Sequence, residues 1–61
     1  MLERYDEILD INDLSEILKI GSSHAYKLVR EGKIHAFKSG KDWKIPKVSV
    51  IKYIKERSGL I

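Results

Sequence analysis

The spacing of apolar residues near the start of the chain predicts a short amphipathic helix over residues 11–19. Apolar side chains recur there at intervals of three and four, which places them on one helix face. They are Ile11, Leu14, Ile17 and Leu18. Asp10 precedes the pattern, where its carboxylate can accept from the amide of Asp13, whose own carboxylate can return the contact. Ile8-Leu9 predict a short strand, and residues 1–7 show no period and predict a loose lead-in.

A second helical pattern covers residues 22–31, after a turn of only three residues, 19–21. The apolar positions, which predict its buried face, are Ala25, Leu28 and Val29. The polar positions on the opposite face are Ser23, Lys27 and Arg30. Gly32 follows, where a glycine suits a left-handed C-terminal cap. The two predicted helices therefore meet at a tight turn.

The apolar period changes from helical to alternating at residue 34, which predicts a β-hairpin over residues 34–45. Its expected parts are a strand at 34–38, a loop at 39–42 and a strand at 43–45. Pro46 ends the second strand and can stand at the entry of a helix. A third amphipathic helix then covers 47–57, with Ser58-Gly59 closing it. The apolar residues of this helix are Val50, Ile51 and Ile54.

Composition limits what such a chain can do. Sixty-one residues form one small domain with one core, and leave no room for a deep substrate cleft. Cysteine is absent, which excludes disulfides, cysteine-ligated zinc and thiol catalysis. Apolar runs do not exceed two residues, so we expect neither a transmembrane helix nor a signal peptide. The sequence thus predicts a soluble cytoplasmic domain.

Charge is distributed unevenly along the chain. Residues 1–18 carry six acids and one base, whereas residues 19–61 carry eleven bases and three acids. The two parts therefore have net charges of −5 and +8, for +3 overall. A concentrated basic stretch suggests a polyanionic partner such as nucleic acid.

The polar face of the second predicted helix is the first candidate for chemistry. A helix, a short turn and a second helix with a basic outer face is the arrangement that places a recognition helix in the DNA major groove. The candidate recognition residues are Ser22, Ser23, Tyr26, Lys27 and Arg30. Small hydroxyls permit close approach, and the cations can reach guanine edges or phosphates. A solvated helix face explains the same pattern, and Tyr26 fits equally well as an aromatic residue at the core edge.

The predicted hairpin is the second candidate, as a wing beside a DNA groove. Its lysines Lys38, Lys41 and Lys44 lie on and around the tip, where they can contact phosphates. The alternative is a hairpin that lysines keep soluble and protect against edge pairing. Trp43 could touch sugar or base, but we interpret it as a core residue that anchors the wing.

Catalytic and metal sites are not predicted. Ser22, Ser23 and His24 are neighbours on a helix and point in different directions, with no carboxylate placed to orient the imidazole. His24 and His35 have no cysteine or clear carboxylate partner that would complete a metal site. No glycine-rich phosphate loop is present. We therefore expect a protein that is not an enzyme and needs no cofactor.

Three stretches match, in order and spacing, one family of DNA-binding domains. They are AYKLVREGKI at 25–34, AFKSG at 36–40 and WKIP at 43–46. Over residues 8–54 the chain resembles the excisionase-type domains related to the DNA-binding half of MerR regulators. The resemblance implies a winged helix-turn-helix fold, mainly α with a small β-hairpin. It also implies that the second helix enters the major groove while the wing contacts backbone or the adjacent minor groove.

The chain departs from the family pattern at four positions. Lys19 replaces a common glycine in the turn, Gly21 replaces the usual hydroxyl cap, and His35 stands where proline is frequent. Asp42 places an acid on the wing where the family often has a base, and an acid there opposes phosphate.

The resemblance implies a protein that bends, bridges or marks double-stranded DNA. We expect an architectural protein of bacterial or phage origin, an excisionase that assists an integrase of the tyrosine or serine class. A small MerR-like transcriptional regulator uses the same surface, and an adaptor that binds an acidic protein is a third possibility. No long helix follows the third one, so we expect a monomer. Its acidic segment, residues 3–16, could contact the basic side of a neighbouring copy on DNA. The alternative is that this segment only caps the first helix and keeps the protein soluble.

Overall fold

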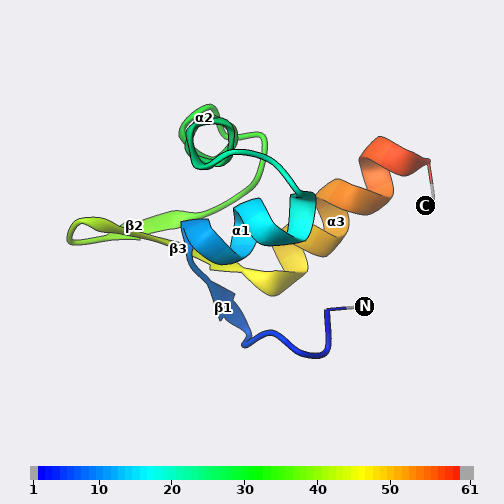
Figure 1. Ribbon diagram of the computed structural model, residues 1–61, viewed down its shortest axis with the longest axis horizontal. Coiled ribbons are helices and arrows are strands. Elements are labelled where there is room, and N and C mark those ends of the chain that lie inside the picture. The colour runs from blue at the N-terminus through cyan, green and yellow to red at the C-terminus, as the bar shows by residue number, and fades with distance from the viewer. Residues whose placement is uncertain (1, 60–61) are drawn as a thin grey trace.

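The computed structural model describes residues 2–59, which form three helices and a small antiparallel sheet (Figure 1). In chain order the elements are β1 (Ile8–Leu9), α1 (Ile11–Leu18), α2 (Ser22–Arg30), β2 (Phe37–Ser39), β3 (Asp42–Pro46) and α3 (Lys47–Ser58). All three helices lie within one residue of their predicted bounds. The fold class expected from the sequence is confirmed.

The sheet contains β1 as well as the two strands of the hairpin. Its order is β1-β3-β2, with both neighbouring pairs antiparallel. Ile8 lies opposite Pro46 and Leu9 opposite Ile45. Side chains alternate across a strand, so the buried residues Leu9 and Ile45 share the core face while Ile8 is turned to the outer face.

The hairpin is shorter and tighter than predicted. Residues 34–36 are not part of a strand, and the loop is the two-residue turn Gly40-Lys41 instead of four residues. Gly40 has a φ of 65° at the first central position, which fits a type II′ turn. The expected start at residue 34 was wrong because the amides of Lys33 and Ile34 both donate to the carbonyl of Leu28, at 3.0 and 3.4 Å. That backbone caps α2 and cannot pair with a strand.

Local hydrogen bonds fix where α1 begins. The Asp13 amide donates to Asp10 Oδ1 at 2.8 Å, and the Asp10 amide donates to Asp13 Oδ2 at 3.2 Å. This is the predicted reciprocal cap.

One apolar cluster joins all the helices and two of the strands. Its buried members are Leu9, Ile11, Leu14, Ala25, Leu28, Val29, Ile34, Ile45 and Val50. Trp43 and Tyr53 are half-buried against this cluster. In α3 only Val50 is fully buried, whereas the predicted core residues Ile51 and Ile54 are partly exposed.

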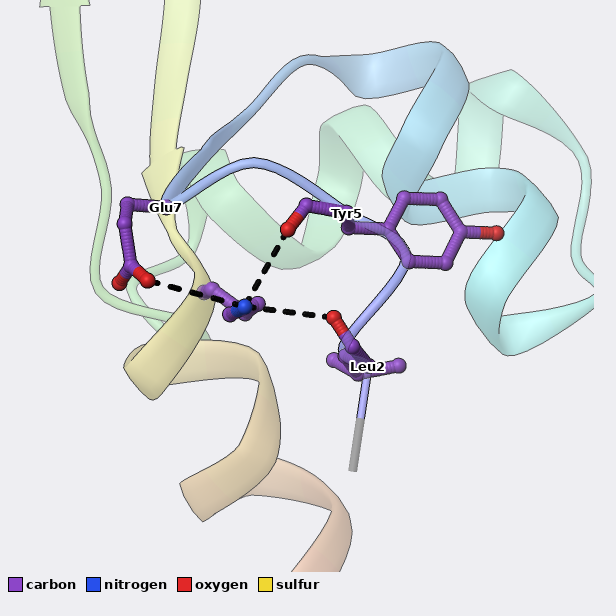
Figure 2. Close-up of polar contacts among 4 residues, drawn as sticks. Leu2, Tyr5 and Glu7 are labelled. Carbon is purple, nitrogen blue, oxygen red and sulfur yellow. Dashed lines mark hydrogen bonds and ion pairs between the residues drawn. The ribbon is translucent and has the colours of Figure 1, made fainter.

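The side chain of Lys47 connects the start of α3 to the N-terminal segment, at the residues labelled in Figure 2. Its ammonium donates to the carbonyl oxygens of Leu2 and Tyr5, at 3.3 and 3.2 Å, and lies 3.7 Å from Glu7 Oε1. Its backbone N–H donates to the carbonyl of Glu7 at 2.7 Å. Residues 2–7 are therefore held in place, and the predicted loose lead-in is corrected.

A second contact holds the same segment against α1. The Tyr5 hydroxyl donates to Glu16 Oε1 at 2.7 Å. The hydrogen bond to this carboxylate raises the pKa of the Tyr5 hydroxyl, because it stabilises the protonated form.

Candidate nucleic-acid interface

A turn of three residues sets α2 against α1. Lys19 adopts the left-handed conformation with a φ of 56°, and its amide donates to the carbonyl of Glu16 at 3.3 Å. The amide of Ile20 donates to the carbonyl of Ser15 at 3.0 Å, which closes the end of α1. Gly21 then supplies the extended N-cap residue of α2, without a side-chain cap. The helices thus meet as expected, although a lysine occupies the backbone position that favours glycine.

The two faces of α2 divide as the apolar period predicts. Ala25, Leu28 and Val29 are buried in the core. All five candidate recognition residues, Ser22, Ser23, Tyr26, Lys27 and Arg30, are exposed. Tyr26 is 44% exposed, so it is a surface residue and does not belong to the core.

Gly32 ends α2 and so fixes the length of its outer face. It has a φ of 76°, and its amide donates to the carbonyl of Val29 at 3.3 Å while that of Lys33 donates to Leu28. This pair of bonds is the Schellman arrangement, and it confirms the predicted left-handed cap.

The cations on α2 are available to a ligand. Within residues 2–59, neither Lys27 nor Arg30 forms a hydrogen bond or an ion pair with another side chain. Both lie in the last turn of α2, where the helix dipole favours positive charge. The outer face of α2 therefore combines small hydroxyls with two uncompensated charges.

The hairpin does not place its three lysines on one side. Lys38 pairs with Trp43 and Lys44 pairs with Phe37, in successive rows of the ladder. Successive residues of a strand point to opposite faces, so Lys38 and Lys44 lie on opposite sides of the hairpin. Figure 1 shows the hairpin projecting beyond the helices, with α2 seen end-on above it.

Trp43 anchors the hairpin, as we predicted. Its side chain is half-buried and packs against the core. The Lys38 ammonium lies 5.9 Å from the centre of the indole ring, within the range of a cation–π contact. Trp43 therefore connects the core to one wing lysine, whereas Lys41 stands in the turn itself.

An open hollow of about 430 Å³ lies between these two candidate surfaces. It borders the part of β3 that extends beyond β1. Its lining comes from the start of α1 and its cap, from α2 and from β3: Asp10, Ile11, Asn12, Ser22, Tyr26, Asp42, Trp43 and Lys44. The hollow thus brings candidate residues of the recognition helix together with candidate residues of the wing.

The sequence did not identify Asn12 and Asp10 as part of this surface. Asn12 occupies a solvent-facing position of α1, and Asp10 was explained completely by its capping role. No periodic or motif signal marks either residue as a neighbour of the wing. Only the packing of α1 beside β3 places them there.

The described residues offer no metal site. No group of three or more histidine, cysteine, aspartate or glutamate side chains between residues 2 and 59 could hold a metal ion. Ser22, Ser23 and His24 are all exposed on α2. In the same part of the chain, no helix is long and apolar enough to cross a membrane.

Comparison with known proteins identifies one family. The family model of a helix-turn-helix domain matches residues 8–58, which is most of the chain and includes every described helix and strand. No curated protein and no solved structure gives a significant match to the sequence. A helix-turn-helix domain implies DNA binding. The fold, the turn between α1 and α2 and this match agree: the chain belongs to the helix-turn-helix domain family.

Proposed function

We propose that this protein binds double-stranded DNA sequence-specifically and has an architectural role, as an excisionase that helps an integrase excise a mobile element. The observation that carries the proposal is the outer face of α2, where Lys27 and Arg30 are exposed and have no partner within residues 2–59. A short helix with such a face fits the major groove, where lysine and arginine recognise guanine edges.

The hairpin supports the same proposal from the other side of the hollow. Lys38 and Lys44 on opposite faces, with Lys41 at the turn, suit a wing that straddles phosphates beside a groove. Phosphate contacts fix orientation, while base contacts in the major groove give specificity. The recognition helix and the wing would thus divide these two tasks.

The excisionase role rests on the motif pattern at 25–46 and adds an integrase as partner. A small transcriptional regulator would use the same α2 surface on a different DNA address. An adaptor for an acidic protein would use the basic face without DNA.

A footprint on the DNA that surrounds the protein's own gene tests the proposal. We expect protection of specific sites, with binding that weakens as salt increases because phosphate contacts release counterions. Added integrase should then excise the flanked element only when this protein is present. Protection that overlaps a promoter without any effect on excision would favour the regulator, and no protection at any salt concentration would favour the adaptor.

A further inference from the structure

Two acids, Asp10 and Asp42, line the hollow between α2 and the hairpin, where the proposed DNA surface needs cations. Asp42, the first residue of β3, lines the hollow together with Ser22 and Tyr26 of α2. Asn12 of α1 lines it from a third element. The Asp10 carboxylate accepts from the Asp13 amide in the cap of α1. That of Asp42 lies beside two hydroxyls and an amide, with Lys44 also in the lining.

The carboxylate of Asp42 is not paired with a cation of the described residues. The hairpin carries Lys38, Lys41 and Lys44, and one of them is adjacent to Asp42 in the chain. Even so, Asp42 forms no ion pair or hydrogen bond with another side chain among residues 2–59. Lys38 is instead directed over the ring of Trp43. The carboxylate is exposed and available to an external donor.

Duplex DNA offers only one kind of donor to such a carboxylate. Phosphates repel the carboxylate, and the sugar oxygens of a duplex have no hydrogen to donate to it. The amino groups of cytosine and adenine in the major groove and of guanine in the minor groove can donate to it. A carboxylate near the backbone therefore lowers affinity for every sequence except those that present an amino group at that place. This combination of a penalty and one permitted contact is how specificity arises.

We infer that Asp42 is a specificity-determining residue that accepts a hydrogen bond from the exocyclic amino group of one base. The inference rests on the proposed DNA binding and adds a base contact on the wing side of the hollow. Asn12 and Tyr26 border the same hollow.

The test compares wild type with Asp42→Ala on a preferred duplex, obtained by selection from a randomised pool, and on variants of every base pair in it. Wild type should lose roughly fivefold or more in affinity when the amino-bearing base is replaced, the lower range for a base-specific contact. Asp42→Ala should lose this discrimination at that one position. It should also bind the replaced duplexes more tightly than wild type does.

Asp6→Ala is the matched control, because it removes one exposed acid from the N-terminal segment, outside the hollow. It should leave discrimination unchanged at every position. Replacing guanine by inosine removes only the minor-groove amino group, so a loss with inosine places the contact in the minor groove. A loss that follows replacement of the base pair but not the inosine substitution places the contact in the major groove.

The inference is wrong if Asp42→Ala raises affinity for all duplexes by one factor, or if Asp6→Ala has the same effect. Either result would mean that Asp42 affects DNA affinity only through the net charge of the protein. A wild-type protein that binds no duplex would instead refute the proposed function itself. Circular dichroism of each variant excludes misfolding as the cause.

Discussion

At the scale of single residues, Lys47 is a partly buried cation at the first position of α3. A cation at the first position of a helix opposes the helix dipole. Lys47 tolerates this position because two carbonyl oxygens and Glu7 surround its ammonium, and its side chain is only 14% exposed. The N-terminal segment and α3 thus stabilise each other.

Lys47→Met should lower the free energy of unfolding by about 1–3 kcal/mol, the usual cost of removing a charged hydrogen-bond donor from a partly buried site. Glu7→Gln is the control and should cost less than about 1 kcal/mol, because an exposed ion pair contributes little. Glu7 is 84% exposed, and its pair with Lys47 spans 3.7 Å. Urea denaturation measures both changes. Equal losses in the two variants would contradict this account.

Lys19→Gly should stabilise the protein. The left-handed backbone of Lys19 costs roughly 1–2 kcal/mol for a residue with a Cβ atom. Relief of this strain is partly offset, because glycine is more flexible in the unfolded chain and costs about 0.5–1 kcal/mol on folding. We therefore expect the free energy of unfolding to rise by about 0.5–1 kcal/mol. Glu31→Gly at the C-cap of α2, where φ is −86°, should destabilise instead. A rise in stability for both variants, or for neither, would show that backbone strain at Lys19 is not the cause.

Residue-scale features were predictable when their partners are close in sequence. The Asp10–Asp13 cap needs only a spacing of three, which the sequence displays directly. The contacts of Lys47 with Leu2 and Tyr5 span 45 and 42 positions and leave no local pattern. Only the folded chain brings these residues together.

At the scale of elements, the apolar period predicts the bounds of the helices closely but those of the hairpin less well. The alternating pattern from residue 34 indicated a strand, but the cap of α2 requires the backbone of Lys33 and Ile34. Ile34 still enters the core, which is why its apolar character was visible in the sequence. The pattern therefore identified Ile34 correctly as a buried residue but assigned it to a strand, to which it does not belong.

The lysines of the wing should contribute to the salt dependence of DNA affinity. Replacing Lys38, Lys41 and Lys44 together by alanine should weaken specific and nonspecific DNA binding about equally. Each lost phosphate contact should reduce the magnitude of the negative slope of log affinity against log salt by about 0.9. Replacement of Lys33, Lys52 and Lys55, three exposed lysines outside the hairpin, controls for net charge and should have a smaller effect. An identical slope in the wild type and the wing variant would remove the hairpin from the interface.

At the scale of the whole molecule, charge separation is the main feature. The first 18 residues have a net charge of −5 and the remainder +8, and the structure holds residues 2–7 against α1 and α3. We expect the acidic N-terminal part of one copy to contact the basic part of a neighbouring copy along DNA, an arrangement that need not close into a symmetric dimer. The overall architecture was predictable because each element has a local signal. The hollow between α2 and the hairpin was not, because it depends on how three elements pack.

We expect the chain alone to be a monomer whose copies bind adjacent DNA sites cooperatively. The described helices have at most twelve residues, too short for a coiled coil. A single module of this size buries only about 600–1,000 Å² on DNA, so neighbouring copies should raise affinity. Duplexes with one, two and three sites measure this gain, and sedimentation without DNA measures assembly. Independent binding at all spacings would exclude cooperation, and a stable dimer without DNA would exclude the monomer.

The central claim is that the outer face of α2 recognises DNA, and affinity measurements on Lys27→Ala and Arg30→Ala test it most directly. Each variant should bind the preferred duplex more weakly by roughly 1–3 kcal/mol if its side chain contacts a base, with a smaller change on unrelated duplexes. The fold should persist, because both residues are exposed and have no partner within residues 2–59. Wild-type affinity in both variants, with an unchanged circular dichroism spectrum, would contradict the assignment of α2 as the recognition helix.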